Sequence, residues 1–96
     1  MRAARVDSNQ GKIDEAAEKV GCCIVRASKA PELGFDRLYI RHGRVYIVEV
    51  KDGEKPPSKR QLTDNEKRTR ADIEAAGGVY HVIESVDDFY RMVGMQ

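Results

Sequence analysis

The sequence has no tryptophan, few prolines and only two cysteines, and it contains no long run of apolar residues. Because about 20 consecutive apolar residues are needed to cross a bilayer, a membrane-spanning helix is excluded. The two cysteines, Cys22 and Cys23, are neighbours, so on a strand their side chains point to opposite faces. They have no spaced partner for a zinc site, and we expect two buried, reduced thiols.

The chain also lacks a strong net charge and an apolar segment near its N-terminus. Residues 1–5 are basic but lead into polar residues, which is not the pattern of a secretory signal, so we expect an intracellular, cytoplasmic protein. The net charge of +1 gives no general signal for nucleic-acid binding. Residues 51–70 hold seven Lys or Arg against four Asp or Glu, a local basic excess that suits phosphate contacts or a solvated face.

What is present suffices for one small domain that covers residues 1–96. Apolar residues at helical spacing predict a first helix over 8–20, which Asp7 or Ser8 can cap and Gly21 can end. This stripe consists of Ile13, Ala16, Ala17 and Val20. A domain of this size has little stability to spare, and self-association would help it.

The rest of the chain predicts four strands and two further helices. The expected elements are a strand over 22–26, a loop over 28–34, strands over 35–41 and 44–51, a loop over 52–58, a helix starting at Ser58 or Thr63, a strand over 79–83 and a helix after Ser85. Either helix start offers a capping box, because Gln61 and Glu66 follow three residues later. The order α-β-β-β-α-β-α predicts an α/β fold with a mixed sheet flanked by helices.

The dipeptide His42-Gly43 favours a two-residue hairpin turn between two β-rich runs. With that turn, Asp36 pairs with Glu49, and alternation places Lys51 on the same face. The remaining residues of that face, which we expect to face a dry environment, are Leu38, Ile40, Val45 and Ile47. Opposed carboxylates favour a cation between them, and oxygen ligands suit Mg²⁺ or Mn²⁺. A three-residue turn would shift the pairing by one and leave only a surface Lys–Glu pair, with Asp36 in a loop.

Two segments at these positions resemble a known group of nucleases. Gly34-Phe-Asp-Arg-Leu and Val48-Glu-Val-Lys51 resemble the motifs of the PD-(D/E)xK superfamily, in particular of the VRR-NUC family and its small stand-alone members from bacteria and phages. The resemblance covers most of the chain, although Phe35 replaces the proline that usually precedes the aspartate. It implies a restriction-endonuclease-like core in the order αβββαβ.

The resemblance also implies a catalytic site and its cofactor. In the family the aspartate and the glutamate bind Mg²⁺ or Mn²⁺, which makes Asp36 and Glu49 the metal ligands here, with the backbone carbonyl of Val50. Lys51 would complete the catalytic set.

Two amide side chains extend this expected site. Gln61 corresponds to a glutamine that follows in the family's next helix, although it can equally serve as the capping partner of Ser58. Gln10 is the candidate for the polar ligand on the first helix, ahead of Asp7 and Asp14. We expect Glu66 to be a capping residue rather than a ligand.

The implied function is a structure-specific endonuclease that hydrolyses DNA phosphodiester bonds, and as a homodimer it could resolve four-way (Holliday) junctions. Phosphate contacts are expected at Arg37, Lys55, Lys59 and Arg60, although Arg37 can instead pair with an acid. Tyr39 and Tyr46 oppose each other on the far face, where they favour cross-strand packing, with base stacking as the alternative. The competing functions are a non-catalytic module that binds nucleic acid or protein, and a restriction-type or exonucleolytic nuclease.

Overall fold

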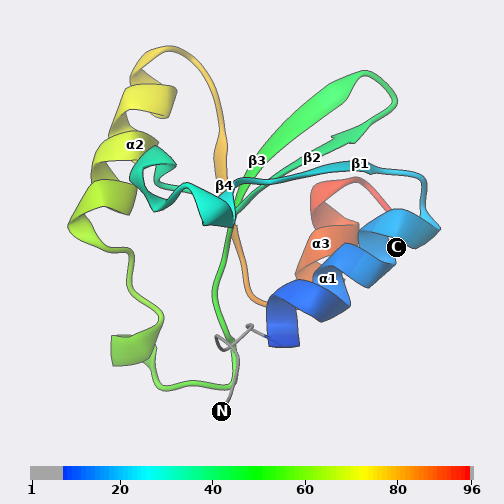
Figure 1. Ribbon diagram of the computed structural model, residues 1–96, viewed down its shortest axis with the longest axis horizontal. Helices are drawn as coiled ribbons and strands as arrows, with labels where there is room; N and C mark the ends of the chain where they lie inside the picture. The colour runs from blue at the N-terminus through cyan, green and yellow to red at the C-terminus, as the bar shows by residue number, and fades with distance from the viewer. Residues whose placement is uncertain (1–7, 96) are drawn as a thin grey trace.

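The structure, a computed structural model, describes residues 8–95, which form helices and strands in the predicted order (Figure 1). The elements are α1 Ser8–Lys19, β1 Cys23–Arg26, β2 Arg37–Arg41, β3 Arg44–Val50, α2 Asp64–Ala75, β4 Tyr80–Ile83 and α3 Val86–Met92. Short 3-10 turns occur at η1 Ala27–Lys29, η2 Pro31–Leu33 and η3 Pro57–Lys59. The helix cap expected at Asp7 or Ser8 lies outside the described side chains. None of the helices in residues 8–95 has the length and apolar character that crossing a membrane requires.

The strands form a mixed sheet in the order β1-β2-β3-β4, in which β3 and β4 run parallel and the other pairs are antiparallel. Arg41 pairs with Arg44, so His42 and Gly43 form the hairpin turn as predicted. Both turn residues have a positive φ, 52° and 78°, which is the backbone that a two-residue turn between twisted strands requires. The alternative of a three-residue turn is therefore wrong.

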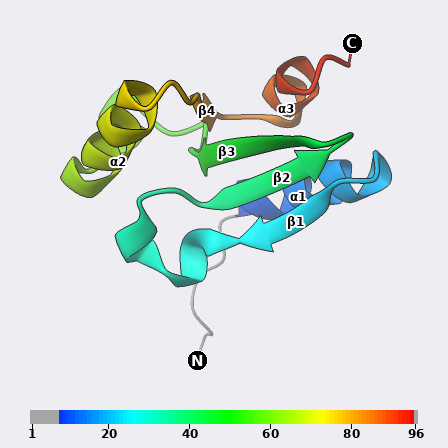
Figure 2. The same ribbon diagram turned by 90° about the horizontal axis from the view of Figure 1, so that it is seen from above.

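The main hydrophobic core lies between the sheet and the helices α1 and α3, which lie side by side (Figures 1 and 2). Tyr39 is fully buried, and its ring meets that of Phe89 edge-on with the centroids 5.4 Å apart. The core residues are Ile13, Ala16, Ala17, Tyr39, Tyr46, Val48, Val50, Ile83, Phe89 and Val93. Tyr39 and Tyr46 pair across β2 and β3 as expected, and their burial leaves no ring surface for base stacking.

The opposite side of the sheet carries an apolar surface that no helix covers fully, here named the open face. Its residues are Cys23, Val25, Leu38, Ile40, Val45 and Ile47, which register and alternation place on one side. Val45 is 57% exposed and Val25 is 42% exposed. The expectation of a dry environment for this face is therefore wrong within the single chain, because α1 and α3 pack against the tyrosine side. The expected burial of Cys23 fails for the same reason.

Helix α2 lies apart from α1 and α3, and it packs against β4 and η2 (Figure 2). It begins with a capping box in which the Thr63 hydroxyl accepts from the Glu66 amide and the Glu66 carboxylate accepts from the Thr63 amide. The second of the two predicted starts is therefore correct, and Ser58 lies in η3 instead.

Gly34 allows α2 to approach the segment that leads into β2. Its φ is +79°, and a Cβ atom there would lie 2.1 Å from Thr69 Oγ1 of α2, which is too short for two non-bonded atoms. The Tyr80 hydroxyl, from β4, donates a 2.7 Å hydrogen bond to the carbonyl of the same glycine. These contacts place the start of α2 beside the residues that precede β2.

Candidate active site

Asp36 lies directly before β2, and hydrogen bonds fix its backbone. Its amide donates to the Val48 carbonyl at 2.9 Å, and its own carbonyl accepts from the amides of Ala27 and Ser28. Val48 is also the ladder partner of Arg37, so both Asp36 and Arg37 lie opposite this one residue of β3. The regular pairing of β2 with β3 therefore ends at Arg37, and the expected Asp36–Glu49 pair does not form.

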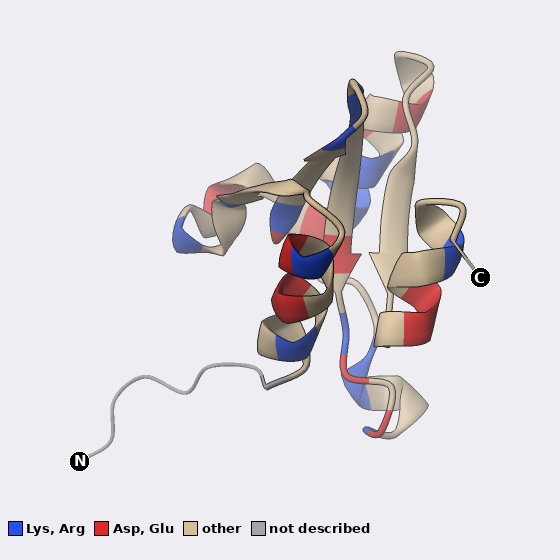
Figure 3. Cartoon of the chain, turned by 90° about the vertical axis from the view of Figure 1, so that its right-hand side faces the viewer, with Lys and Arg blue, Asp and Glu red and all other residues tan. Residues whose placement is uncertain are grey.

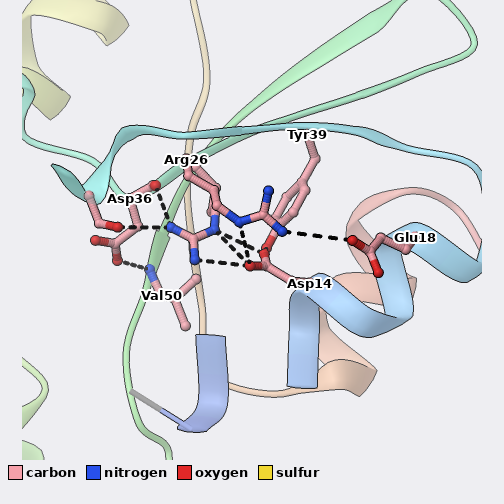
Figure 4. Close-up of polar contacts among 8 residues, drawn as sticks. Asp14, Glu18, Arg26, Asp36, Tyr39 and Val50 are labelled. Carbon is pink, nitrogen blue, oxygen red and sulfur yellow. Dashed lines mark hydrogen bonds and ion pairs between the residues drawn. The ribbon is translucent and has the colours of Figure 1, made fainter. Parts of the chain in front are cut away.

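The Asp36 carboxylate turns toward the end of β3 instead. Its Oδ2 accepts a 2.9 Å hydrogen bond from the Val50 amide, as Figure 4 shows. Burial raises the pKa of this carboxyl above its usual value, although the Val50 hydrogen bond acts in the opposite direction. Asp36 is thus a partly buried acid held over the last residues of β3.

Glu49 projects from β3 into the same region and is almost fully buried, with 3% of its surface exposed. Its Oε2 lies 3.2 Å from Lys51 Nζ, while its Oε1 is buried without a hydrogen-bond donor. When Glu49 carries a proton, it shares a hydrogen bond with the Glu66 carboxylate. Burial raises the pKa of Glu49 to about 9, and the neighbouring Glu66 and Asp36 add to the increase. The Asp36 carboxylate therefore lies close enough to Glu49 to influence its protonation.

Lys51 connects this pair of acids to α2. Its Nζ lies 3.2 Å from Glu49 Oε2 and 3.0 Å from Glu66 Oε1. Burial alone would lower the pKa of Lys51, but the hydrogen bond to Glu66 and the charge of Glu49 raise it above its usual value. Lys51 is therefore a protonated, largely buried ammonium between the carboxyl groups of Glu49 and Glu66.

Glu66 is the site residue that sequence reasoning missed. The capping box was visible in the sequence, but the contact with Lys51 depends on how α2 packs against the sheet. Burial alone would raise the pKa of the Glu66 carboxyl. Its contacts with Glu49, the Thr63 amide and Lys51 outweigh this effect and lower the pKa below its usual value.

Behind Asp36, a buried network joins β2 to α1 (Figure 4). Arg37 is 5% exposed, and its guanidinium donates to both carboxylate oxygens of Asp14 at 2.9–3.2 Å. The Tyr39 hydroxyl donates to Asp14 Oδ1 at 2.6 Å, and Arg37 Nη1 donates to the Asp36 carbonyl at 3.0 Å. Arg37 thus pairs with an acid and supports Asp36 from below, so its alternative role in phosphate binding is wrong.

Neither Gln61 nor Gln10, the two amide residues expected in the site, makes a described hydrogen bond to its acids. Gln61 is exposed in the segment between η3 and α2, with no hydrogen bond to the Asp36–Glu49–Lys51 cluster in the described part. Gln10 is half-buried in the first turn of α1. The adjacent Asn9 donates to the Lys51 carbonyl at 2.7 Å and to the Glu84 carbonyl at 3.0 Å, which brings the start of α1 beside the end of β3.

Of the other expected phosphate contacts, Lys55 and Lys59 are exposed in the segment after β3. Arg60 is engaged instead, because its Nη1 lies 3.0 Å from Glu84 Oε1. Figure 3 shows Lys and Arg close to Asp and Glu on the helices and on the segment after β3.

A cavity of about 560 Å³ lies between α2 and β4, and its lining includes Arg60, Gln61, Lys67 and Val82.

Two acids of the site, Asp36 and Glu49, are the candidate ligands for a metal ion. Among the described residues, no group of three or more His, Cys, Asp and Glu is arranged to hold one. Magnesium takes one or two protein carboxylates and completes its shell with water and phosphate, so Asp36 and Glu49 fit this requirement. The unpartnered Oε1 of Glu49 fits it as well, because a buried acceptor without a donor is costly unless a cation reaches it.

Comparison with known proteins supports the fold. No family model and no curated protein sequence matches this chain. A solved structure described as "VRR_NUC domain" is similar, with a TM-score of 0.63 and 20% sequence identity, over 88% of this chain and 94% of that one. The similarity of fold thus extends well beyond the two sequence segments, over 88% of this chain. The protein has the restriction-endonuclease-like fold of a VRR_NUC domain.

Proposed function

We propose that this protein is a metal-dependent DNA endonuclease of the VRR-NUC family that acts on branched or otherwise structured DNA. One observation carries the proposal: Glu49 holds a buried oxygen without a hydrogen-bond partner, next to Asp36 and Lys51. A buried carboxylate oxygen without a donor is costly unless a cation reaches it, whereas the carboxylates of surface ion pairs are open to water. The fold shared with a VRR_NUC domain supports the same conclusion.

In the proposed reaction, Asp36 and Glu49 bind Mg²⁺ or Mn²⁺, with the Val50 carbonyl as a further candidate ligand. A bound ion of this kind polarises the phosphate and lowers the pKa of a bound water. Asp36 keeps its orientation through the Val50 amide, and Lys51 Nζ supplies positive charge on the same side of β3. The lysine can stabilise charge that develops on the phosphate or orient the attacking water. The oxygen of water would bond to phosphorus as one P–O bond of the DNA backbone breaks; the water gives up a proton and the leaving oxygen takes one up, so that a phosphate monoester and a free hydroxyl result.

The substrate should be recognised by its shape. Residues 8–95 form one small sheet with three helices, and no further unit that could read bases occurs among these residues. Lys55 and Lys59 are exposed in the segment that follows β3 and suit contacts with phosphates, which position DNA without reading its sequence. Junctions, flaps or nicks are therefore the proposed substrates.

A homodimer would explain the open face and would supply two sites. A continuous apolar surface across several strands is typical of an interaction site. Val25 and Val45 expose apolar surface there that a second copy could bury. Symmetric cutting of a four-way junction requires two active sites related by a two-fold axis, and a dimer with this symmetry provides them.

A cleavage assay on plasmid and four-way-junction DNA, with Mg²⁺ or Mn²⁺, tests the proposal. The wild-type protein should cut, and Asp36→Ala and Lys51→Ala should not. Asp72→Ala and Lys29→Ala are matched controls, because both residues are exposed and lie outside the site; they should cut like the wild type.

The alternatives give distinct results in the same assay. Binding of the junction without cutting in either metal would favour a non-catalytic nucleic-acid-binding module. Mapping of the products separates a structure-specific endonuclease from an exonuclease, because the latter releases nucleotides from ends only.

A further inference from the structure

We infer that Glu66 is a positioning residue of the proposed nuclease site, where its carboxylate holds the ammonium group of Lys51 in place. This inference rests on the proposed function, and it gives the start of α2 a role beyond helix capping. It assigns to an acid on α2 a task that neither Asp36 nor Glu49 can perform while both bind a metal ion.

The contact geometry places Lys51 under the control of α2. Lys51 Nζ lies 3.0 Å from Glu66 Oε1 and 3.2 Å from Glu49 Oε2. The side chains of Lys51 and Glu66 are only 14% and 17% exposed, so the pair is largely shielded from water. An ion pair in such a position restrains a long lysine side chain more strongly than an exposed one.

Glu66 is itself held in a fixed orientation. The oxygen that faces Lys51 also accepts a 2.9 Å hydrogen bond from the Thr63 amide, which belongs to the capping box. The helix that carries it is anchored near Gly34, where the Thr69 hydroxyl donates to the Leu33 carbonyl at 3.1 Å. The carboxylate is therefore a rigid anchor on a rigid element.

Glu49 cannot serve as the only anchor for Lys51. In the proposed site its carboxylate binds the metal ion, which draws electron density away from the oxygen that faces the lysine. Glu66 is not one of the proposed ligands, so it can hold Lys51 both with and without the metal. Capping alone would not require the carboxylate to lie against a half-buried lysine.

Four variants of the full-length protein separate positioning from capping. Glu66→Gln keeps an oxygen that can accept from the Thr63 amide but loses the charge opposite Lys51. Glu66→Ala removes both functions, and Thr63→Ala removes only the hydroxyl side of the capping box. Glu74→Gln removes a charge from the exposed part of α2, where Glu74 pairs with Arg70, and serves as the matched control.

The first readout is steady-state cleavage of a four-way junction with Mg²⁺. Glu66→Gln and Glu66→Ala should lower kcat by about 10-fold to 100-fold with little change in KM, because a misplaced catalytic group slows the chemical step. Thr63→Ala should lower the thermal midpoint but leave kcat within a factor of two, and Glu74→Gln should match the wild type. A wild-type kcat in Glu66→Gln would overturn the inference and leave Glu66 as a capping residue only.

The second readout does not depend on activity. In ¹⁵N NMR of the side-chain ammonium groups, Lys51 should give a protected, slowly exchanging signal in the wild type, which Glu66→Gln should remove. If the wild type fails to cut DNA but shows this signal and its loss, the proposed function fails and the positioning role stands. If the wild type gives no protected Lys51 signal, the positioning role is refuted whatever the activity.

Discussion

Replacement of Asp14 by asparagine should destabilise the fold strongly, because it leaves a buried guanidinium without its counter-charge. Asp14 and Arg37 are 8% and 5% exposed, and Asp14 accepts three hydrogen bonds from Arg37 and one from Tyr39. Removing one partner of a buried ion pair costs about 3–5 kcal/mol. The asparagine still accepts from Tyr39, so we expect a loss of about 3 kcal/mol in the free energy of unfolding.

Urea denaturation followed by far-UV circular dichroism measures this loss, and a thermal scan should show a midpoint lower by about 12–24 °C. Glu15→Gln is the matched control, because Glu15 is an exposed acid on the same helix, and it should unfold like the wild type. The triple variant Asp14→Leu, Arg37→Met, Tyr39→Phe should recover most of the stability, since no buried charge then remains unpaired; the former partners Ser28 and Arg26 are exposed and can bind water instead. A loss below about 1 kcal/mol for Asp14→Asn would refute the assignment of this network as a buried support for Asp36.

Three further predictions follow from the site and the fold. In metal-free protein the pKa of Glu49 is raised to about 9, so the folded state keeps a proton that the unfolded chain loses near its ordinary value of 4.5. The free energy of unfolding should therefore fall as pH rises from about 5 to 9, and urea titrations at several pH values should show that Glu49→Gln removes more than about 1 kcal/mol of that fall. Gly34→Ala should lower the free energy of unfolding by about 2–4 kcal/mol, because the added Cβ would collide with Thr69. Gly77 also has a positive φ, but a Cβ there meets no atom within 4 Å, so Gly77→Ala should lower it by only about 1 kcal/mol. Equal losses for the two variants in urea denaturation would contradict the close contact at Gly34. Val45→Glu should convert a dimer into a monomer in size-exclusion chromatography with light scattering, and a wild type that runs as a monomer at all concentrations would rule out the open face as a dimer interface.

Local sequence signals were sufficient for the element order and for the hairpin. The spacing of Ile13, Ala16 and Ala17 identified α1, and the His42-Gly43 turn determined the pairing of β2 with β3. These features depend on residues that are close in sequence, so turn chemistry and helical periodicity describe them well.

The choice of the core face could not be made from the hairpin alone. Both of its faces are apolar, with tyrosines and valines on one side and aliphatic residues on the other. Which side is buried depends on where α1 and α3 dock, and Tyr39 and Phe89 meet only in the folded chain. Alternation describes two faces but does not say which one the helices cover.

The composition of the site was predictable where it depends on the hairpin, and not where it depends on α2. Glu49 and Lys51 follow from alternation along β3, and Asp36 follows from the resemblance to the nuclease motifs. Glu66 comes close to Lys51 only because Gly34 and Tyr80 fix α2 against the sheet. The sequence favoured Gln61 over Glu66 as a site residue, but Gln61 precedes the helix and is exposed.

The most direct test of the proposed site is a crystal of the protein soaked in Mn²⁺ and examined by anomalous scattering. We predict one manganese peak at the end of β3, bound by an oxygen of Asp36 and by Oε1 of Glu49 at about 2.0–2.2 Å, with Lys51 still in contact with Glu66. A fully soaked crystal with no peak between these two acids, or with both carboxylates turned away from a shared ion, would contradict this prediction.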